Sequence, residues 1–176
     1  MTRQKQIQTG RKPQKSRTGG RVLWAVAGLV LGTVLTALVG KTAMPRLMLV
    51  TTESTFPYKE TVTRIEDAIE REGWSSPGTL NLTKSMNKHG VEFPHRVQVI
   101  QLCKPEYAEQ VLQSDRYVSS IMPCAISVWE DDDGRVYISK MNTGLMGKMF
   151  GGTIAKVMGG PVAADEHRIL ADVMIR

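Results

Sequence analysis

Two cysteines are the residues of this chain best suited to redox or soft-metal chemistry. Cys103 ends one strand-like segment and Cys124 begins another. Two cysteines in a small domain of an oxidising compartment commonly form a disulfide, which requires Cα atoms closer than about 7 Å. Parallel strands would hold the thiols apart, whereas neighbouring antiparallel strands would let them meet. The sequence leaves open a disulfide, two buried thiols, or a redox or metal site that lacks the Cys-x-x-Cys spacing.

Methionines form a second group of soft ligands. Four of the ten methionines fall in one short segment, at Met141, Met146, Met149 and Met158. Thioethers and thiolates select Cu(I), and Met146 and Met149 lie one helical turn apart. The candidate metal ligands are therefore Cys103, Cys124, Met146 and Met149. The interpretation we favour is that the methionines fill a core or an interface, and that the glycines among them leave an apolar binding surface.

No pattern typical of an enzyme active site accompanies these residues. The three histidines, His89, His95 and His167, are too far apart in sequence for a zinc motif. The acidic run before Gly134 lacks the later glutamate of a calcium loop, so it predicts a solvated turn. No nucleophile has an assignable acid or base partner. We therefore expect a non-catalytic protein and assign no cofactor.

An apolar run near the N-terminus predicts a membrane anchor. Nineteen uncharged residues, Val22 to Gly40, follow an arm with seven basic residues and no acidic residue. A helix of this length just crosses a hydrocarbon core of about 30 Å, and the run is too long for a cleaved signal peptide. The positive charge before it predicts a cytoplasmic N-terminus. The remaining chain would then lie in the periplasm of a bacterium, on the cytoplasmic membrane.

The net charge belongs almost entirely to the arm. The chain carries +6 and its first 21 residues carry +7, which leaves −1 for everything beyond them. A nucleic-acid-binding domain needs a basic face of its own, so we exclude that class. The polar arm should be disordered and should set the orientation of the anchor, with attraction to anionic lipids as a secondary effect.

Small residues follow one stripe of the predicted membrane helix. Gly28 and Gly32 are four residues apart, and Thr36 and Gly40 continue the spacing. Such a stripe permits close helix packing in a dimer. Glycine is also common in membrane helices without any such role, and we favour this neutral interpretation.

The rest of the chain alternates strand and helix patterns. Strands are predicted at 47–52, 95–103, 123–130 and 135–141, and a weaker edge strand around Leu80. Helices are predicted at 59–72, 105–113, 145–158 and 163–175, the first from its apolar spacing. Asp131 to Gly134 is a tight turn between antiparallel strands. The pattern predicts an α+β domain in which helices cover one sheet.

Five segments of this domain occur in an order that is also found in a known protein family: LMLVTTES, EREGW, VIQLCKPEYAEQVL, IMPCAISVWEDDDGRVYISKMNTGLM and VAADEHRIL. The most specific elements are Cys103 to Pro105, the Pro123–Cys124 pair and the Met141–Asn142 step after the hairpin. Over roughly residues 47–175 the chain resembles the domain of unknown function 302 family. The resemblance implies an antiparallel sheet backed by helices, of the TATA-binding-protein-like class, and dimers. It implies no activity, because the family has none assigned.

These observations predict four parts of the chain. They are a basic arm (1–21), a transmembrane helix (22–40), a juncture (41–46) in which Pro45 ends the helix, and one α+β domain (47–176). We expect a membrane-tethered binding module for a partner protein or a small apolar ligand. The alternative is a periplasmic redox or soft-metal protein that uses Cys103, Cys124 and the methionine segment.

Overall fold

The computed structural model describes residues 18–175, which form two compact units divided between Thr42 and Ala43. The first unit holds most of helix α1 (Thr18–Met48). The Val26–Met48 portion of α1 is long and apolar enough to cross a membrane. A signal sequence would meet the same criteria of length and composition. The predicted arm lies mostly outside the described residues.

The expected juncture before the domain is wrong, because α1 continues through Pro45 to Met48. Proline removes its own N–H from the helix ladder and its ring crowds the carbonyl four residues earlier, yet the helix accommodates Pro45. The residues that follow Pro45 before the helix ends, Arg46, Leu47 and Met48, are good helix formers. The helix therefore ends immediately before the first strand.

The second unit is built on one five-stranded antiparallel sheet with the strand order β1-β5-β4-β3-β2. The strands are β1 (Leu49–Glu53), β2 (Thr79–Asn81), β3 (Val97–Leu102), β4 (Cys124–Glu130) and β5 (Val136–Met141). The hairpin between β4 and β5 is confirmed. Asp131 accepts hydrogen bonds from the backbone of Asp133 and Arg135, and Gly134 adopts a φ of 77° that favours glycine.

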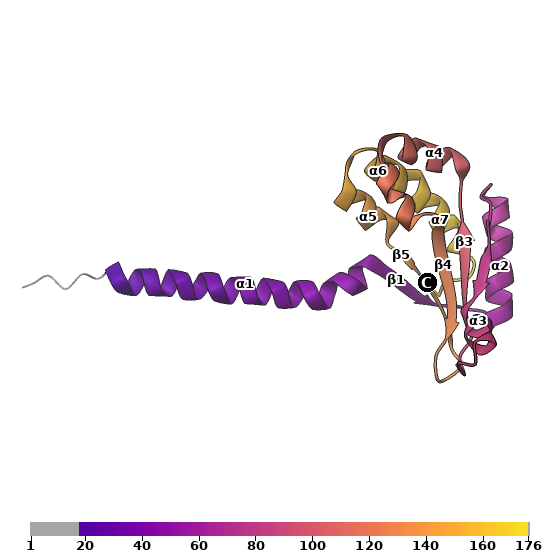
Figure 1. Cartoon of the computed structure of the whole chain (residues 1–176), viewed down its shortest axis with the longest axis horizontal. Coiled ribbons are helices and arrows are strands. Elements are labelled where there is room, and N and C mark those ends of the chain that lie inside the picture. Colours follow the sequence, from indigo (N-terminus) through magenta and orange to yellow (C-terminus); the bar gives the residue numbers. More distant parts are fainter. Residues whose placement is uncertain (1–17, 176) are drawn as a thin grey trace, which may run out of the picture. The chain divides into compact units, whose positions relative to one another are not determined.

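Helices connect and cover these strands. They are α2 (Tyr58–Arg71), α3 (Leu82–Lys88), α4 (Pro105–Ser114), the 3₁₀ helix η1 (Arg116–Ile121), α5 (Thr143–Phe150), α6 (Gly152–Val157), the π-helical turn η2 (Met158–Val162) and α7 (Ala163–Leu170). Figure 1 shows α2 beside the sheet and α4, α5 and α6 together near one end of its strands. This arrangement confirms the α+β class with one antiparallel sheet.

The core lies on the face of the sheet that α2 and α7 cover. Ile65 and Ile69 of α2 are fully buried, as are Ile100 and Ile126 of the central strands. Their spacing in α2 is the helical spacing that predicted the element. On the opposite face of β3, β4 and β5 the alternate residues are only half-buried or exposed. Trp129 and Tyr137 stack on that face with ring centroids 4.7 Å apart.

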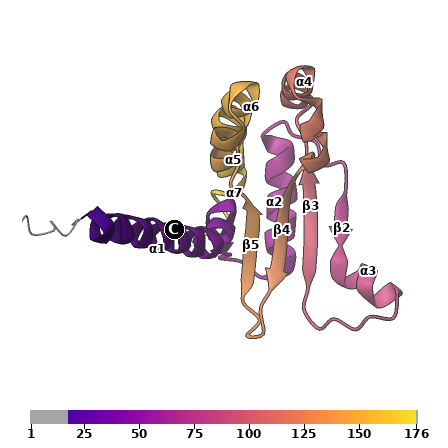
Figure 2. The same ribbon diagram turned by 60° about the vertical axis from the view of Figure 1, so that its left-hand side comes forward.

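The strand ends bring the helices α4, α5 and α6 together. β3 and β5 finish, and β4 begins, at the end of the sheet nearest these helices (Figure 2). The chain segments that carry both cysteines and five of the ten methionines therefore converge at this end.

Candidate functional site

A pocket of about 320 Å³ lies at this end of the sheet. We call it the apolar pocket. Its wall includes residues of β1, η1, β4, β5, α5 and α7, among them Leu49, Ile121, Cys124, Met141, Met146 and Glu166. The volume is at the lower end of the range for small-molecule sites. Such a pocket suits a small, largely apolar molecule.

One ion pair supplies the main polar groups of the apolar pocket. Lys140 Nζ on β5 donates to Glu166 Oε2 on α7 over 2.7 Å, and Thr143 Oγ1 donates to the same oxygen over 2.8 Å. The Glu166 side chain is 3% exposed and that of Lys140 16% exposed. A buried charge of this kind is tolerated only when it is paired. The pair is therefore a fixed charged end in a pocket whose other lining residues are mostly apolar.

Cys124 lines the same pocket in a state that does not favour nucleophilic chemistry. Burial raises the pKa of its thiol to about 12, and the nearby carboxylate of Glu166 adds to the increase. The thiolate is the reactive form of cysteine, so this thiol is chemically quiet at neutral pH. The structure offers no activated cysteine at this position.

The two cysteines are brought near each other but are not bonded. β3 and β4 are antiparallel neighbours, and Leu102 lies opposite Cys124, so the antiparallel alternative is the correct one. Cys103 and Cys124 are both free and half-buried. Both line a small second cavity of about 20 Å³, together with Met122 and Met158. That space is enough for about one water molecule.

The methionine segment is divided between the pocket and the surface. Met141, Met146 and Met158 line the apolar pocket, whereas Met149 is 53% exposed. Of the four predicted metal ligands, the structure thus places Cys124 and Met146 at one pocket and Cys103 at the smaller cavity. Among the described residues, no group of three His, Cys, Asp or Glu side chains is placed to hold a metal ion.

Glycine is required where α5 meets the next turns of the chain. A Cβ added to Gly147 would lie 2.9 Å from the backbone nitrogen of Gly159 and 3.2 Å from Cα of Ala155. Real Cβ atoms do not approach backbone so closely. The absence of a side chain at Gly147 therefore allows α5 to pack tightly against α6 and η2.

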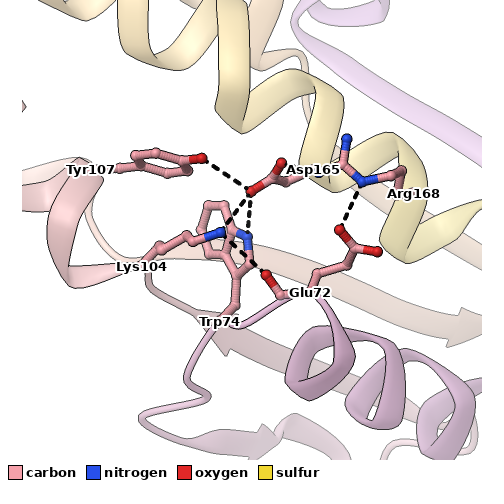
Figure 3. Close-up of polar contacts among 6 residues, drawn as sticks. All are labelled: Glu72, Trp74, Lys104, Tyr107, Asp165 and Arg168. Atoms are coloured by element: carbon pink, nitrogen blue, oxygen red, sulfur yellow. Dashed lines mark hydrogen bonds and ion pairs between the residues drawn. The ribbon is translucent and has the colours of Figure 1, made fainter.

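A second buried carboxylate, Asp165, joins four segments of the domain (Figure 3). Its Oδ2 accepts hydrogen bonds from Trp74 Nε1 over 2.9 Å, Lys104 Nζ over 3.2 Å and Tyr107 Oη over 3.4 Å. It also pairs with Arg168, which in turn pairs with Glu72 over 2.7 Å. Burial alone would raise the pKa of Asp165, but these hydrogen bonds and charges outweigh it and lower the pKa.

This network positions α7 rather than forming a binding site. The donors around Asp165 are engaged with Asp165 or with Glu72, and the adjoining cavity is small. Because Asp165 precedes Glu166, a fixed Asp165 also fixes the carboxylate that ends the apolar pocket. The network is therefore the support for the candidate site.

Sequence reasoning missed Lys140, Glu166 and the Asp165 network. A usable signal exists, because Asp165 and Glu166 lie three to five residues before the buried pair Ile169 and Leu170. Residues at these spacings share a helix face. Two acidic residues on the buried face of a helix predict buried ion pairs.

The small-residue stripe of α1 remains a prediction. Gly28 and Gly32 are exposed, and a Cβ at either position would meet nothing within 4 Å in the described part of the chain. The stripe is open to a partner helix, which is all that the spacing predicted.

Comparisons with known proteins identify the domain. No curated protein matches the chain. A crystal structure titled as an uncharacterized conserved protein DUF302 from Bacillus stearothermophilus matches with a TM-score of 0.61 and 20% identity, over 72% of this chain and 96% of that chain. At this identity the likeness shows the fold alone. The family model described as "Domain of unknown function DUF302" matches residues 50–174, and the chain therefore belongs to the DUF302 family.

Proposed function

We propose that this protein is a membrane-tethered binding module, and that its apolar pocket holds a small amphiphile with one polar end. The observation that carries the proposal is the pairing of an apolar wall with the buried Lys140–Glu166 pair. The module is non-catalytic, because the pocket combines a protonated thiol with two charges that neutralise each other.

Unused hydrogen-bonding capacity at the ion pair supports this ligand class. Among the described residues, Lys140 Nζ donates one hydrogen bond, to Glu166, and an ammonium group has three donors. Glu166 receives both of its hydrogen bonds at Oε2, which leaves the capacity of Oε1. A hydroxyl or amide head group can donate to the carboxylate and accept from the ammonium, while an apolar tail contacts Leu49, Met141 and Met146.

We further propose that α1 spans the bacterial cytoplasmic membrane once, with the N-terminus in the cytoplasm and the domain in the periplasm. Support comes from the apolar Val26–Met48 helix and from the basic arm before it. A homodimer of domains of the TATA-binding-protein-like class completes the proposal. The stripe at Gly28 and Gly32 and the open face around Trp129 are surfaces on which two copies can meet.

Filling the pocket tests the binding proposal. Ala125 is exposed and lines the pocket, so Ala125→Phe blocks it without entering the core. Ala164→Leu, at an exposed position of α7 outside the pocket lining, is the matched control. The full-length protein is purified from membranes and analysed by native mass spectrometry, and its melting is followed with added decan-1-ol.

The expected result is a bound adduct, or stabilisation by decan-1-ol, in the parent and in Ala164→Leu but not in Ala125→Phe. Equal behaviour of all three proteins would refute a ligand in this pocket. A clean dimer mass with no adduct and no response to decan-1-ol would redirect the search to protein partners.

A second candidate function is favoured by the sulfur atoms of the apolar pocket. Cys124, Met141, Met146 and Met158 all line it, and thiolate with thioethers is the donor set that selects Cu(I). Bound metal would replace the thiol proton of Cys124. Competition with a Cu(I) chelator tests this function on the full-length chain, with Cys124→Ser as the variant and Cys103→Ser as the control. Loss of Cu(I) binding in Cys124→Ser alone supports it, and equal binding in both excludes it.

A further inference from the structure

An exposed apolar patch shares one residue, Ile121, with the lining of the apolar pocket. It consists of Tyr117 and Ile121 from η1 and Met149 and Phe150 from α5, with exposed fractions of 65%, 40%, 53% and 44%. The rings of Tyr117 and Phe150 are 6.3 Å apart between centroids, so the two elements form one surface. Large apolar side chains gathered in this way mark an interaction site.

Basic residues accompany the patch. Arg116 precedes Tyr117 and Lys148 precedes Met149, and both are exposed. The chain contains no acidic residue from 142 to 164, the stretch that includes all of α5 and α6. The nearest acidic residue along η1, Asp115, is half-buried and accepts a hydrogen bond from Ser114 Oγ over 2.7 Å. Apolar and aromatic side chains with a basic rim are complementary to the interface of an anionic bilayer.

The helix that carries half of the patch begins where α1 joins the domain. The side chain of Asn142 donates from Nδ2 to the carbonyl of Leu47 over 3.1 Å, and its backbone nitrogen donates to the carbonyl of Met48 over 2.7 Å. The same side chain caps α5 by accepting from the Leu145 nitrogen over 3.0 Å. α5 has eight residues, so Met149 and Phe150, in its last turn, lie about 12 Å along the helix from Asn142.

We propose that Tyr117, Ile121, Met149 and Phe150 insert into the headgroup region of the membrane that α1 spans, with Arg116 and Lys148 contacting anionic lipid phosphates. The proposal rests on the proposed span and goes beyond it, because a tethered domain need not touch the bilayer. The apolar pocket, which shares Ile121 with the patch, would then open at the lipid surface.

Hydroxyl-radical footprinting of the full-length protein tests this contact without any substitution. The protein is prepared at one copy per nanodisc of phosphatidylcholine and phosphatidylglycerol, and separately in amphipol, which surrounds α1 but offers no lipid plane. The oxidation rates of Met149 and Tyr117 are compared with those of Leu80 and Val91, which are 50% and 54% exposed and serve as internal controls. Co-elution of the protein with the nanodisc reports separately on the span.

We expect Met149 and Tyr117 to oxidise severalfold more slowly in nanodiscs, with Leu80 and Val91 unchanged. The protection should decrease at high salt and in the double variant Arg116→Gln/Lys148→Gln. Equal oxidation of Met149 in nanodiscs and amphipol, in a protein that co-elutes with the disc, would overturn the bilayer contact and leave the span intact. Protection that appears only with two copies per disc would assign the patch to a second copy and overturn the proposal. Failure to co-elute would overturn the span and this inference together.

Discussion

Removing Lys140 should test how strongly the fold depends on the buried ion pair. Lys140→Met keeps most of the length of the side chain but leaves Glu166, a residue that is 2% exposed, without its counter-charge. Breaking one partner of a buried pair costs about 3–5 kcal/mol. The total free energy of unfolding of a domain is roughly 5–15 kcal/mol, so the loss is large. It corresponds to a decrease of about 10–15 °C in melting temperature.

A surface pair of the same length provides the control. Arg64 Nη2 and Glu60 Oε1 are also 2.7 Å apart, but these side chains are 45% and 46% exposed. Exposed pairs contribute about 0.3–0.5 kcal/mol on a helix, so Arg64→Met should hardly change stability. Burial is the main difference between the two ion pairs, although Arg64→Met also removes the contact of Arg64 with the Phe56 ring, 3.9 Å from its centroid.

Urea denaturation of the full-length protein in mild detergent, followed by tryptophan fluorescence, measures both variants. The double variant Lys140→Met/Glu166→Gln removes both charges and should recover most of the loss, since no unpaired charge remains buried. Similar losses in Lys140→Met and Arg64→Met would refute the reasoning. Failure of the double variant to recover would show that packing around Lys140, rather than charge pairing, holds this end of the sheet.

Three further outcomes follow from particular residues. The lowered pKa of Asp165 means that its carboxylate stabilises the fold above its ordinary pKa of 3.8 and loses this effect as the pH falls through the lower folded-state pKa; Asp165→Asn should be less stable at neutral pH and should converge with the parent as the pH falls through that folded-state pKa. Because the pKa of Cys124 is about 12, iodoacetamide at pH near 8 should label it, as read by mass spectrometry, only after urea unfolding, and rapid native labelling would contradict its burial. Gly147→Ala should lose about 1–3 kcal/mol in thermal melting, because its Cβ meets the Gly159 nitrogen at 2.9 Å, whereas Gly144→Ala, with its nearest contact at 3.6 Å, should be neutral or gain up to about 1 kcal/mol.

The elements that local patterns encode were predicted well. The spacing of Val62, Ile65 and Ile69 predicted α2, and the Asp131–Gly134 turn predicted the β4–β5 hairpin. These signals act over a few residues, within one turn of a helix or one tight turn. The α+β class followed from their order, and the family resemblance is confirmed.

The candidate site was predicted only in part because it depends on contacts between distant residues. Cys124 and Met146 were named, but Lys140 and Glu166 are 26 positions apart in the sequence, and nothing local pairs them. Met149 was grouped with Met146 because the two residues are three positions apart. Three residues turn a helix by about 300° rather than a full turn, so the two side chains do not point in the same direction. The structure places Met149 at the surface. Pro45 was expected to end α1, but a single missing N–H did not stop the helix.

Asn142 also has a mechanical consequence. Its backbone and side chain hold the last two carbonyls of α1, while its Oδ1 holds the first turn of α5. Strand β1 follows α1 directly and lies at the edge of the sheet, paired only with β5. Any tension or tilt carried by α1 would therefore be transmitted first to Asn142 and to this one strand pair. Because Leu49 of β1 and Met141 of β5 line the apolar pocket, the wall of this pocket is the first part of the domain on which a force along α1 would act.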